Sequence, residues 1–225
     1  MNMRINFNVY VIALIIIVSN SMCAQTSKEP RSYLALGDSY TIGESVAENE
    51  RWPVQLAKAL TEKGTAVATP RIIAVTGWRT DNLKNGINIA QIKEKYDLVS
   101  LLIGVNNQYQ GKSAEDYAVE YEDLLKTAIQ LAGGDKSNVF VVSIPDYGYT
   151  PFGAPNQEKI SKELDEFNAI NKRITDAYGI TYINITDISR KGLEDPELVA
   201  EDTLHPSGKQ YTLWVKRILE SLKLK

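Results

Sequence analysis

The chain contains one histidine, His205, and its neighbours are those that a catalytic base would need. It lies in the segment Asp202-Thr203-Leu204-His205-Pro206, where a three-residue spacing allows the side chains of Asp202 and His205 to meet over one turn. A carboxylate in this position can orient the imidazole, which can then take the proton from a serine hydroxyl. The segment predicts such a base, and a surface histidine beside a helix-capping aspartate is the alternative.

A candidate nucleophile, Ser39, follows the first apolar run of the chain, in the segment Leu36-Gly37-Asp38-Ser39-Tyr40. If that run is a strand, Ser39 lies at its carboxyl end, where the chain turns. A serine in this position can attack a carbonyl carbon once a base removes its proton. Serine at such a junction is also a common helix cap, so this segment alone leaves both roles open.

Two further segments contain groups that could stabilise an oxyanion. Gly77 has no side chain, so its backbone N–H can come close to a ligand. Asn106, in the segment 102–107 with sequence LIGVNN, can direct a side-chain amide to the same place. Each could also be an ordinary turn residue. Together with Ser39 and His205 they predict four polar elements at one edge of a sheet.

Short apolar runs that alternate with longer amphipathic stretches would position these residues. Continuous runs rich in β-branched residues are typical of parallel strands covered on both faces, and the stretches between them have helical spacing. This order predicts a three-layer α/β/α domain with a mostly parallel five-stranded sheet, in which ligands bind beyond the carboxyl ends of the strands. The expected strands are Tyr33 to Leu36, Ile72 to Val75, Leu98 to Ile103, Val139 to Ile144 and Tyr182 to Ile185. One expected helix starts at Pro53. Three more cover Ala114 to Ala132, about Gln157 to Tyr178 and about Pro206 to Leu222.

Local signals mark the ends of two expected helices. Ser113, with Asp116 three residues later, resembles a capping box, and Gly133-Gly134 can end the same helix in a left-handed conformation. Pro206 disfavours helical geometry at His205 and can itself occupy the first helical position. The histidine is therefore expected at the start of the last helix.

The four segments together resemble the signature blocks of the GDSL or SGNH hydrolase superfamily, which includes lysophospholipases and esterases. The blocks are GDSY at 37–40, Gly77, GVN at 104–106 and DTLHP at 202–206, in the family order and over nearly the whole chain after residue 32. The resemblance implies a flavodoxin-like fold, Ser39 as nucleophile, His205 as base and Asp202 as its orienting carboxylate. It also implies three oxyanion donors, namely the backbone N–H of Ser39, Gly77 and Asn106, and no cofactor.

Two sequence details refine this resemblance. The third block of the family often reads G-x-N-D, whereas Asn107 stands here after Asn106, which affects the expected loop geometry and subfamily more than catalysis. The segment from Gly37 to Thr41 lacks the second glycine of the G-x-S-x-G turn, which disfavours an ordinary α/β-hydrolase.

The implied reaction is hydrolysis of a carboxylic ester through an acyl-enzyme. The family takes lysophospholipids, short-chain esters and acylated carbohydrates, and a lipid ester would imply transient contact with a membrane surface. Trp78, Tyr109 and Tyr147 are candidate substrate-binding residues, with the core edge as an equal alternative. The competing function is a catalytically silent protein of the same fold that binds a glycan or lipid at the cell envelope.

Composition excludes other classes of function. The 225 residues carry a net charge of −3 without a basic cluster, so nucleic-acid binding is not expected. One Cys and one His cannot form the usual zinc site or an internal disulfide, and no metal is expected. The sequence does not indicate an oligomeric state.

The N-terminus predicts export. Residues 1–24 contain Arg4 and an apolar run from Val9 to Val18 that is short for a membrane span, as in a signal peptide. We expect a signal peptide at 1–24, a short linker at 25–31, one hydrolase domain at 32–225 and a periplasmic or extracellular location. A retained membrane anchor and a lipid anchor on Cys23 are the minority alternatives, the latter because Met22 is larger than the residue usually found before a lipidated cysteine.

Overall fold

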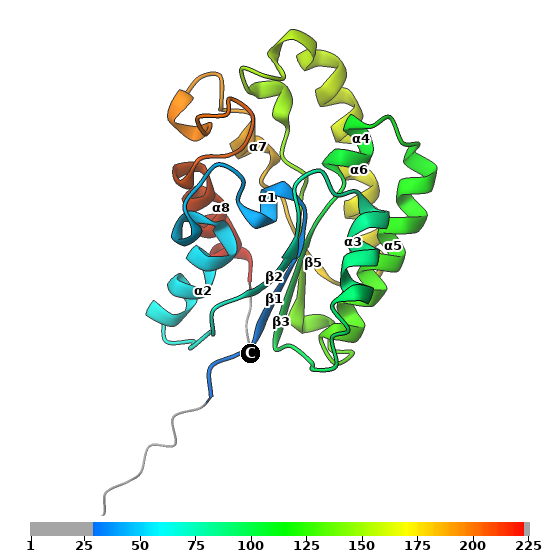
Figure 1. The fold of residues 1–225 in the computed structure, drawn as a ribbon, viewed down its shortest axis with the longest axis vertical. Helices are drawn as coiled ribbons and strands as arrows, with labels where there is room; N and C mark the ends of the chain where they lie inside the picture. The colour runs from blue at the N-terminus through cyan, green and yellow to red at the C-terminus, as the bar shows by residue number, and fades with distance from the viewer. Residues whose placement is uncertain (1–28, 223–225) are drawn as a thin grey trace, which may run out of the picture.

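A five-stranded parallel sheet lies at the centre of the described chain, which comprises residues 29–222 of a computed structural model (Figure 1). The strand order is β2-β1-β3-β4-β5, so the chain first crosses to one side of β1 and then continues to the other. Along the centre of the sheet, Leu36 of β1 lies opposite Ile73 of β2 and Leu101 of β3. The strands are β1 (Tyr33–Gly37), β2 (Arg71–Ala74), β3 (Leu98–Leu102), β4 (Val139–Val142) and β5 (Thr181–Ile183).

Helices cover both faces of this sheet. On one face α2 packs against α8, and on the other α5 packs against α3 and α6 (Figure 1). The shorter helices α1, α4 and α7 directly follow or lie near the carboxyl ends of strands. The helices are α1 (Ser39–Ile42), α2 (Trp52–Glu62), α3 (Thr80–Ile89), α4 (Val105–Tyr109), α5 (Ala114–Leu131), α6 (Gln157–Ala177), α7 (Thr186–Ser189) and α8 (Gly208–Ser221). The predicted three-layer flavodoxin-like architecture is confirmed.

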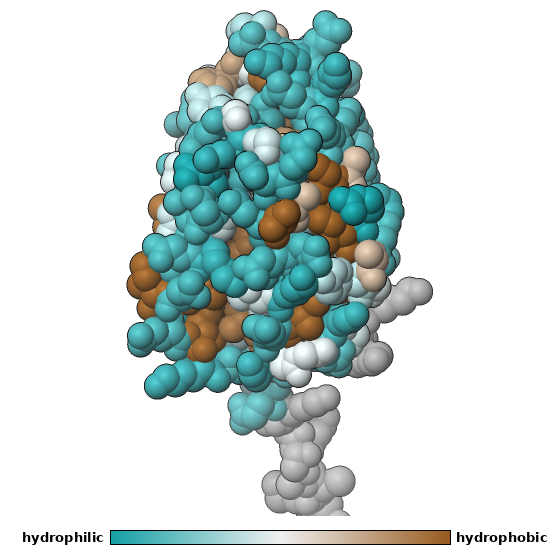
Figure 2. Space-filling view, turned by 90° about the vertical axis from the view of Figure 1, so that its right-hand side faces the viewer, coloured by the Kyte–Doolittle hydropathy of each residue, from teal (hydrophilic) through white to brown (hydrophobic). Residues whose placement is uncertain are grey.

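The hydrophobic core lies between the sheet and both helical layers. Every residue of the central strands β1, β3 and β4 is buried, whereas the edge strands β2 and β5 are partly exposed. This difference explains why the central strands have the most continuous apolar sequences. The outer face over α3 and α5 is mostly hydrophilic, with hydrophobic side chains in separated groups (Figure 2).

The predicted element ends are close to the observed ones, with informative differences. Ser113 caps α5 by accepting a hydrogen bond from the Asp116 N–H, and two glycines with positive φ follow this helix, as predicted. The predicted start of the last helix at Pro206 is wrong: α8 begins at Gly208, because Ser207 provides the cap and accepts from the N–H of Gln210. The expected strands that end at Val75, Ile103, Ile144 and Ile185 also run too far, since the chain leaves the sheet before these residues.

Some predictions concern parts of the chain that the structure does not describe. The predicted signal peptide at 1–24, Cys23 within it and residues 25–28 of the predicted linker all lie outside the described residues. Between residues 29 and 222, no helix is both long and apolar enough to cross a membrane.

Candidate active site

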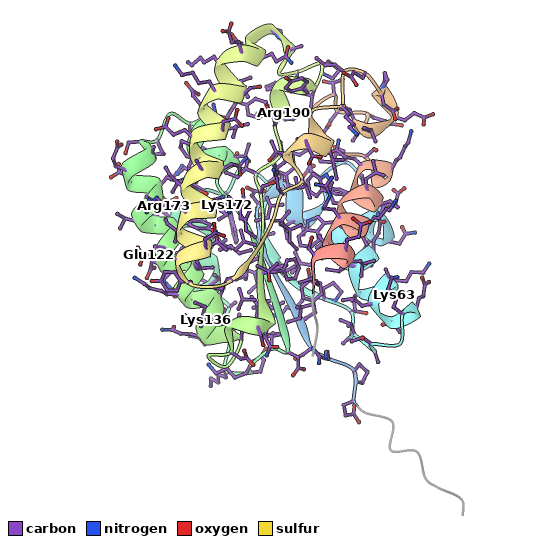
Figure 3. All side chains as sticks on the ribbon, turned by 180° about the vertical axis from the view of Figure 1, so that it is seen from behind. Lys63, Glu122, Lys136, Lys172, Arg173 and Arg190 are labelled. Carbon is purple, nitrogen blue, oxygen red and sulfur yellow. The ribbon has the colours of Figure 1, made fainter. Side chains whose placement is uncertain are left out.

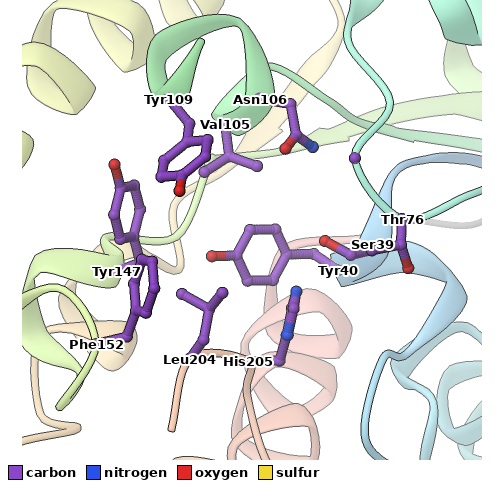
Figure 4. A pocket seen from close by; sticks show the side chains of 11 residues that line it. Ser39, Tyr40, Thr76, Val105, Asn106, Tyr109, Tyr147, Phe152, Leu204 and His205 are labelled. Carbon is purple, nitrogen blue, oxygen red and sulfur yellow. The ribbon is translucent and has the colours of Figure 1, made fainter. Parts of the chain in front are cut away.

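A cavity of about 310 Å³ opens at the carboxyl edge of the sheet (Figure 4). Its polar end contains Ser39, Gly77, Asn106 and His205, which come from four separate segments of the chain. Its other end is formed by apolar and aromatic side chains. The full lining is Ser39, Tyr40, Thr76, Gly77, Val105, Asn106, Tyr109, Tyr147, Phe152, Leu204 and His205.

Ser39 is the first residue of α1 and is almost fully buried, at 4% exposure. The preceding Asp38 caps the helix, since its Oδ1 accepts from the Tyr40 N–H at 3.1 Å. The Tyr40 carbonyl in turn accepts from the Tyr211 hydroxyl of α8 at 3.0 Å. This short helix is therefore fixed both to the end of β1 and to α8, which holds the Ser39 hydroxyl at the cavity wall.

The capping carboxyl of Asp38 is shielded from water. Its side chain is fully buried, and Oδ2 has no hydrogen-bond partner among the described residues. Burial raises the pKa of Asp38 to about 7, against the lowering effect of the hydrogen bond from Tyr40. A carboxyl group that titrates near neutral pH thus lies next to Ser39.

His205 and Asp202 form the predicted pair. The His205 Nδ1 lies 2.6 Å from Asp202 Oδ2, while Asp202 Oδ1 accepts from the backbone N–H groups of Leu204 and His205 at 2.9 Å each. Partial burial is outweighed by these hydrogen bonds and by one from Ser45, and the pKa of Asp202 is lowered to about 2. Because the carboxylate is ionised, it accepts a hydrogen bond from Nδ1, and this bond favours the tautomer in which Nε2 is the acceptor.

The imidazole and the Ser39 hydroxyl line the same cavity (Figure 4). No hydrogen bond joins them within the described chain, an arrangement that is common before substrate binds. The ring of Tyr40 lies beside the His205 ring, with 5.5 Å between the ring centroids. The His205 side chain is 9% exposed, so its imidazole is shielded from bulk water.

The predicted oxyanion donors lie at the polar end of the cavity. Gly77 has a φ of +82°, a left-handed conformation that favours glycine, although a Cβ there would meet no atom. Asn106 Nδ2 donates one hydrogen to the Trp78 carbonyl at 3.0 Å, and the amide has a second hydrogen for a ligand. The bond to Trp78 links the Gly77 and Asn106 segments. Together with Ser39 they line the same cavity, as a shared oxyanion site would require.

Asn107, the departure from the family pattern, has a structural partner. It is buried; its Oδ1 accepts from the Thr80 N–H at 3.1 Å, and its Nδ2 donates to Thr80 Oγ1 at 2.6 Å. Thr80 Oγ1 donates its own hydrogen to Glu120, so toward Asn107 this oxygen can only accept a hydrogen. An asparagine supplies a donor and an ionised aspartate does not, which explains the residue found here.

Two of the three predicted substrate-binding residues line the cavity. Tyr109 and Tyr147 form an aromatic wall with Phe152, with ring centroids 6.1 to 6.4 Å apart. The Trp78 ring is not part of this lining, because it packs against Gly86 of α3. Burial raises the pKa of Tyr147 to about 12, so its phenol is uncharged at neutral pH.

An ion pair between a half-buried arginine and a fully buried carboxylate holds the loop that carries Tyr147. The fully buried Asp146 accepts from Arg190 Nε and from the Gly148 N–H, both at 2.9 Å. Arg190 lies beside this loop at the back of the molecule (Figure 3). Farther along the loop, the Phe152 N–H donates to the Thr203 carbonyl at 3.1 Å. The aromatic wall is thus tied to the segment that carries the base.

Sequence reasoning missed several residues of the site. Tyr40, Thr76, Val105 and Leu204 are immediate neighbours of predicted residues, and this adjacency was the signal that could have found them. Ser45, whose hydroxyl donates to Asp202 at 2.6 Å, lies 157 residues away from it and had no such signal. Within residues 29–222, no group of three or more His, Cys, Asp or Glu side chains is arranged to hold a metal ion.

Comparison with solved structures supports the fold. TesA superposes with a TM-score of 0.69 at 14% identity, covering 86% of this chain and 98% of that one. An acetylxylan esterase, Axe2 from Geobacillus stearothermophilus, gives 0.65 at 18% identity over 87% and 95% of the two chains. A lipase/acylhydrolase from Enterococcus faecalis gives 0.65 at 21% identity over 87% and 98%. No curated protein matches the chain by sequence.

A family model provides the assignment that these distant structures do not. The model of the GDSL-like lipase/acylhydrolase family matches residues 35–213, which include each of the four signature segments and most of the described chain. The chain therefore belongs to the GDSL-like lipase/acylhydrolase family and is a carboxylic ester hydrolase.

Proposed function

We propose that the protein hydrolyses esters in two steps through an acyl group on Ser39. His205 takes the Ser39 proton while Oγ attacks the ester carbonyl, and it returns the proton to the departing alcohol. Water, deprotonated by the same imidazole, then attacks the acyl-serine and releases the acid. In both steps the negative charge on the carbonyl oxygen is stabilised by the N–H groups of Ser39 and Gly77 and the Asn106 amide.

One observation carries this proposal: a nucleophile, an oriented base and three oxyanion donors border one cavity although they come from four distant segments. The silent-binder alternative does not need an imidazole whose Nδ1 is held by an ionised carboxylate. No cofactor has a role in this reaction.

The shape and chemistry of the cavity favour an ester with an apolar acyl chain longer than acetate. Beyond the polar end, the lining consists mainly of Tyr40, Val105, Leu204 and the aromatic wall, and no charged side chain borders it within the described residues. Tyr109 and Phe152 are 59% and 47% exposed, so they form the lip of the cavity and not its floor. Proteins of the same fold include both an acetylxylan esterase and a lipase/acylhydrolase, so the fold alone does not select the acyl group.

Hydrolysis of a p-nitrophenyl ester series, from acetate to long acyl chains, tests the reaction and the substrate class together. The value of kcat/KM should rise from acetate by roughly fourfold for each additional buried methylene until the cavity is filled. Ser39→Ala should abolish the activity without changing the thermal transition. Activity of this variant above background would refute the mechanism, and acetate as the best substrate would refute the acyl pocket alone. Acetylated xylan and lysophosphatidylcholine, tested in parallel, would distinguish carbohydrate from lipid esters.

A matched pair of variants locates the acyl chain. Phe152→Ala shortens the aromatic wall and should flatten the dependence of kcat/KM on chain length. Leu213→Ala removes a comparably exposed apolar side chain from α8, away from the cavity, and should leave this dependence unchanged. If kcat/KM depends on chain length in the same way in both variants, the acyl chain does not bind against Phe152.

We further propose that the protein is exported, on the basis of the signal-peptide pattern at 1–24. The N-terminal mass of the protein recovered from the native cells and their medium tests this directly. Cleavage after residue 22, 23 or 24 is the expected result, and a lipid mass on Cys23 would indicate the anchored form. An intact N-terminus on protein inside the cell would contradict export.

A further inference from the structure

The Asp202 carboxylate has a hydrogen-bond donor from outside its own segment. The Ser45 hydroxyl donates to Asp202 Oδ2 at 2.6 Å, the same oxygen that accepts from the His205 ring at 2.6 Å. Ser45 lies just after α1, the helix that begins with Ser39, so one short segment contacts both Ser39 and the carboxylate that holds the His205 ring. The remaining oxygen, Oδ1, is occupied by two backbone N–H groups. Both oxygens of Asp202 are therefore fixed.

The backbone at Ser45 is held in an uncommon conformation. Its φ is +63°, a left-handed value that a residue other than glycine adopts at a cost of about 1 kcal/mol or more. Glycine would adopt this conformation freely. A serine with this backbone is consistent with a use for its hydroxyl, since the side chain is what glycine lacks.

The segment that carries Ser45 is anchored on its other side. The adjacent Glu44 accepts a hydrogen bond from the Thr76 hydroxyl, and Thr76 directly precedes the predicted oxyanion donor Gly77. The Glu44 N–H also donates to the Ser39 carbonyl at 3.1 Å. Residues 43–46 thus contact the nucleophile helix, the Gly77 segment and the Asp202 segment, and they can hold the three in a fixed relation.

We propose that Ser45 is a positioning residue of the hydrolysis reaction, whose hydroxyl fixes the Asp202 carboxylate so that the His205 imidazole faces Ser39. This inference rests on the proposed roles of Ser39, His205 and Asp202. Ser45 touches neither substrate nor the reacting atoms and acts only through Asp202. Its loss should therefore affect the chemical step and leave substrate binding unchanged.

Two substitutions at the same position separate the hydroxyl from the backbone. Ser45→Ala removes the hydroxyl and keeps the strained φ, whereas Ser45→Gly removes the hydroxyl and relieves the strain. Both should lower kcat by roughly tenfold, the effect of one hydrogen bond to a charged group, with KM unchanged. Their thermal stabilities should differ, with the glycine variant the more stable. If the alanine variant does not fold, the glycine variant still provides the measurement.

A spectroscopic signal gives a second readout. The chemical shift of the Nδ1 proton of the only histidine, His205, should change in both variants, because Asp202 Oδ2 loses its other hydrogen-bond donor. Ser137→Ala is the matched control: the Ser137 hydroxyl donates to Asp135 at 2.7 Å, at an exposed position that does not line the cavity. This control should alter neither kcat nor the Nδ1 proton.

The outcomes distinguish this inference from the reaction on which it rests. Wild-type kcat in either Ser45 variant would overturn the role of Ser45, and a loss confined to Ser45→Ala would assign the effect to the backbone. An unchanged chemical shift of the Nδ1 proton would likewise overturn the role of Ser45. Ser39→Ala, measured in the same assay, reports on the reaction: if that variant remains active, the proposed function fails as well, and if it is inactive, only Ser45 is in question.

Discussion

At the scale of single residues, two adjacent asparagines have different tasks. Asn106 borders the cavity with an amide hydrogen that is free to meet a developing oxyanion, whereas Asn107 is buried and bonded twice to Thr80. The sequence pattern predicts the oxyanion role for Asn106, because the family block places the catalytic amide first. It could not reveal the task of Asn107, because Thr80 and Glu120 are remote in the chain.

Alanine substitutions should separate these tasks. Asn106→Ala should lower kcat by roughly 10²- to 10³-fold, with a smaller change in KM, because one preorganised donor is lost. Asn107→Ala should affect kcat less and lower the free energy of unfolding by about 1–3 kcal/mol, because buried groups of Thr80 lose their partner. Steady-state kinetics and urea unfolding of both variants check this. Equal losses of kcat would mean that the roles of the two residues are not distinct.

Asp38 gives the free energy of unfolding a dependence on pH. Its pKa in the folded protein, about 7, lies above the ordinary value of 3.8, so between these values the folded protein holds a proton that the unfolded chain has released. Stability due to this group is therefore present at low pH and is lost as pH rises toward 7. Asp38→Asn keeps an acceptor for the Tyr40 N–H but cannot ionise.

We expect Asp38→Asn to be more stable than the wild type at pH 8 by a few kcal/mol, since one pKa unit corresponds to about 1.4 kcal/mol. Near pH 4 the difference should largely disappear. Urea unfolding of both proteins at the two pH values measures it. If the difference in the free energy of unfolding is the same at both pH values, burial does not raise the pKa of Asp38.

At the scale of elements, loops that follow the strands carry the site, and their anchors lie outside it. The loop after β4 carries Tyr147 and Phe152, and the ion pair of Asp146 with Arg190 fixes its first turn. Sequence reasoning identified Tyr147 of this loop as a candidate substrate-binding residue but not which side chains enter the cavity. Their direction depends on this pair and on the bond from Phe152 to Thr203, which join distant segments.

Removal of the arginine should loosen the aromatic wall. Arg190→Ala leaves the fully buried Asp146 carboxylate without its cation and should lower the free energy of unfolding by about 3 kcal/mol. KM for longer acyl esters should rise, because Tyr147 is less firmly held. Arg217→Ala breaks a pair with Asp187 in which both side chains are exposed, and it should cost at most about 1 kcal/mol. Equal effects of the two substitutions on stability and KM would contradict the role of the Asp146–Arg190 pair in holding the loop.

At the scale of the whole molecule, much of the architecture could be predicted from sequence because the pattern is repeated. Each central strand is a continuous apolar run, and each long helix has a regular apolar face, so element type and order follow from local sequence. The carboxyl-edge site then follows from parallel topology. Helix α3 was missed because its apolar positions are few: Leu83 and Ile87 are its only buried apolar residues.

What the sequence could not provide are contacts between segments that are distant in the chain. The hydrogen bond from Ser45 to Asp202 and the packing of Trp78 on Gly86 depend on how loops meet after the sheet has formed. Because Trp78 follows Gly77, the sequence makes it a candidate for the substrate site, with the core edge as an equal alternative. The chain turns at that glycine, and the indole ring points to α3 while its carbonyl remains beside Asn106.

The claim that Ser39 is the activated nucleophile is tested most directly by its covalent labelling. The purified protein is incubated with a serine-directed organophosphonate, and a peptide digest is examined by mass spectrometry. We predict a single adduct, on Ser39, and no adduct when the same reagent is applied to Ser39→Ala. An adduct on another serine with loss of activity, or loss of activity with Ser39 unmodified, would contradict the account.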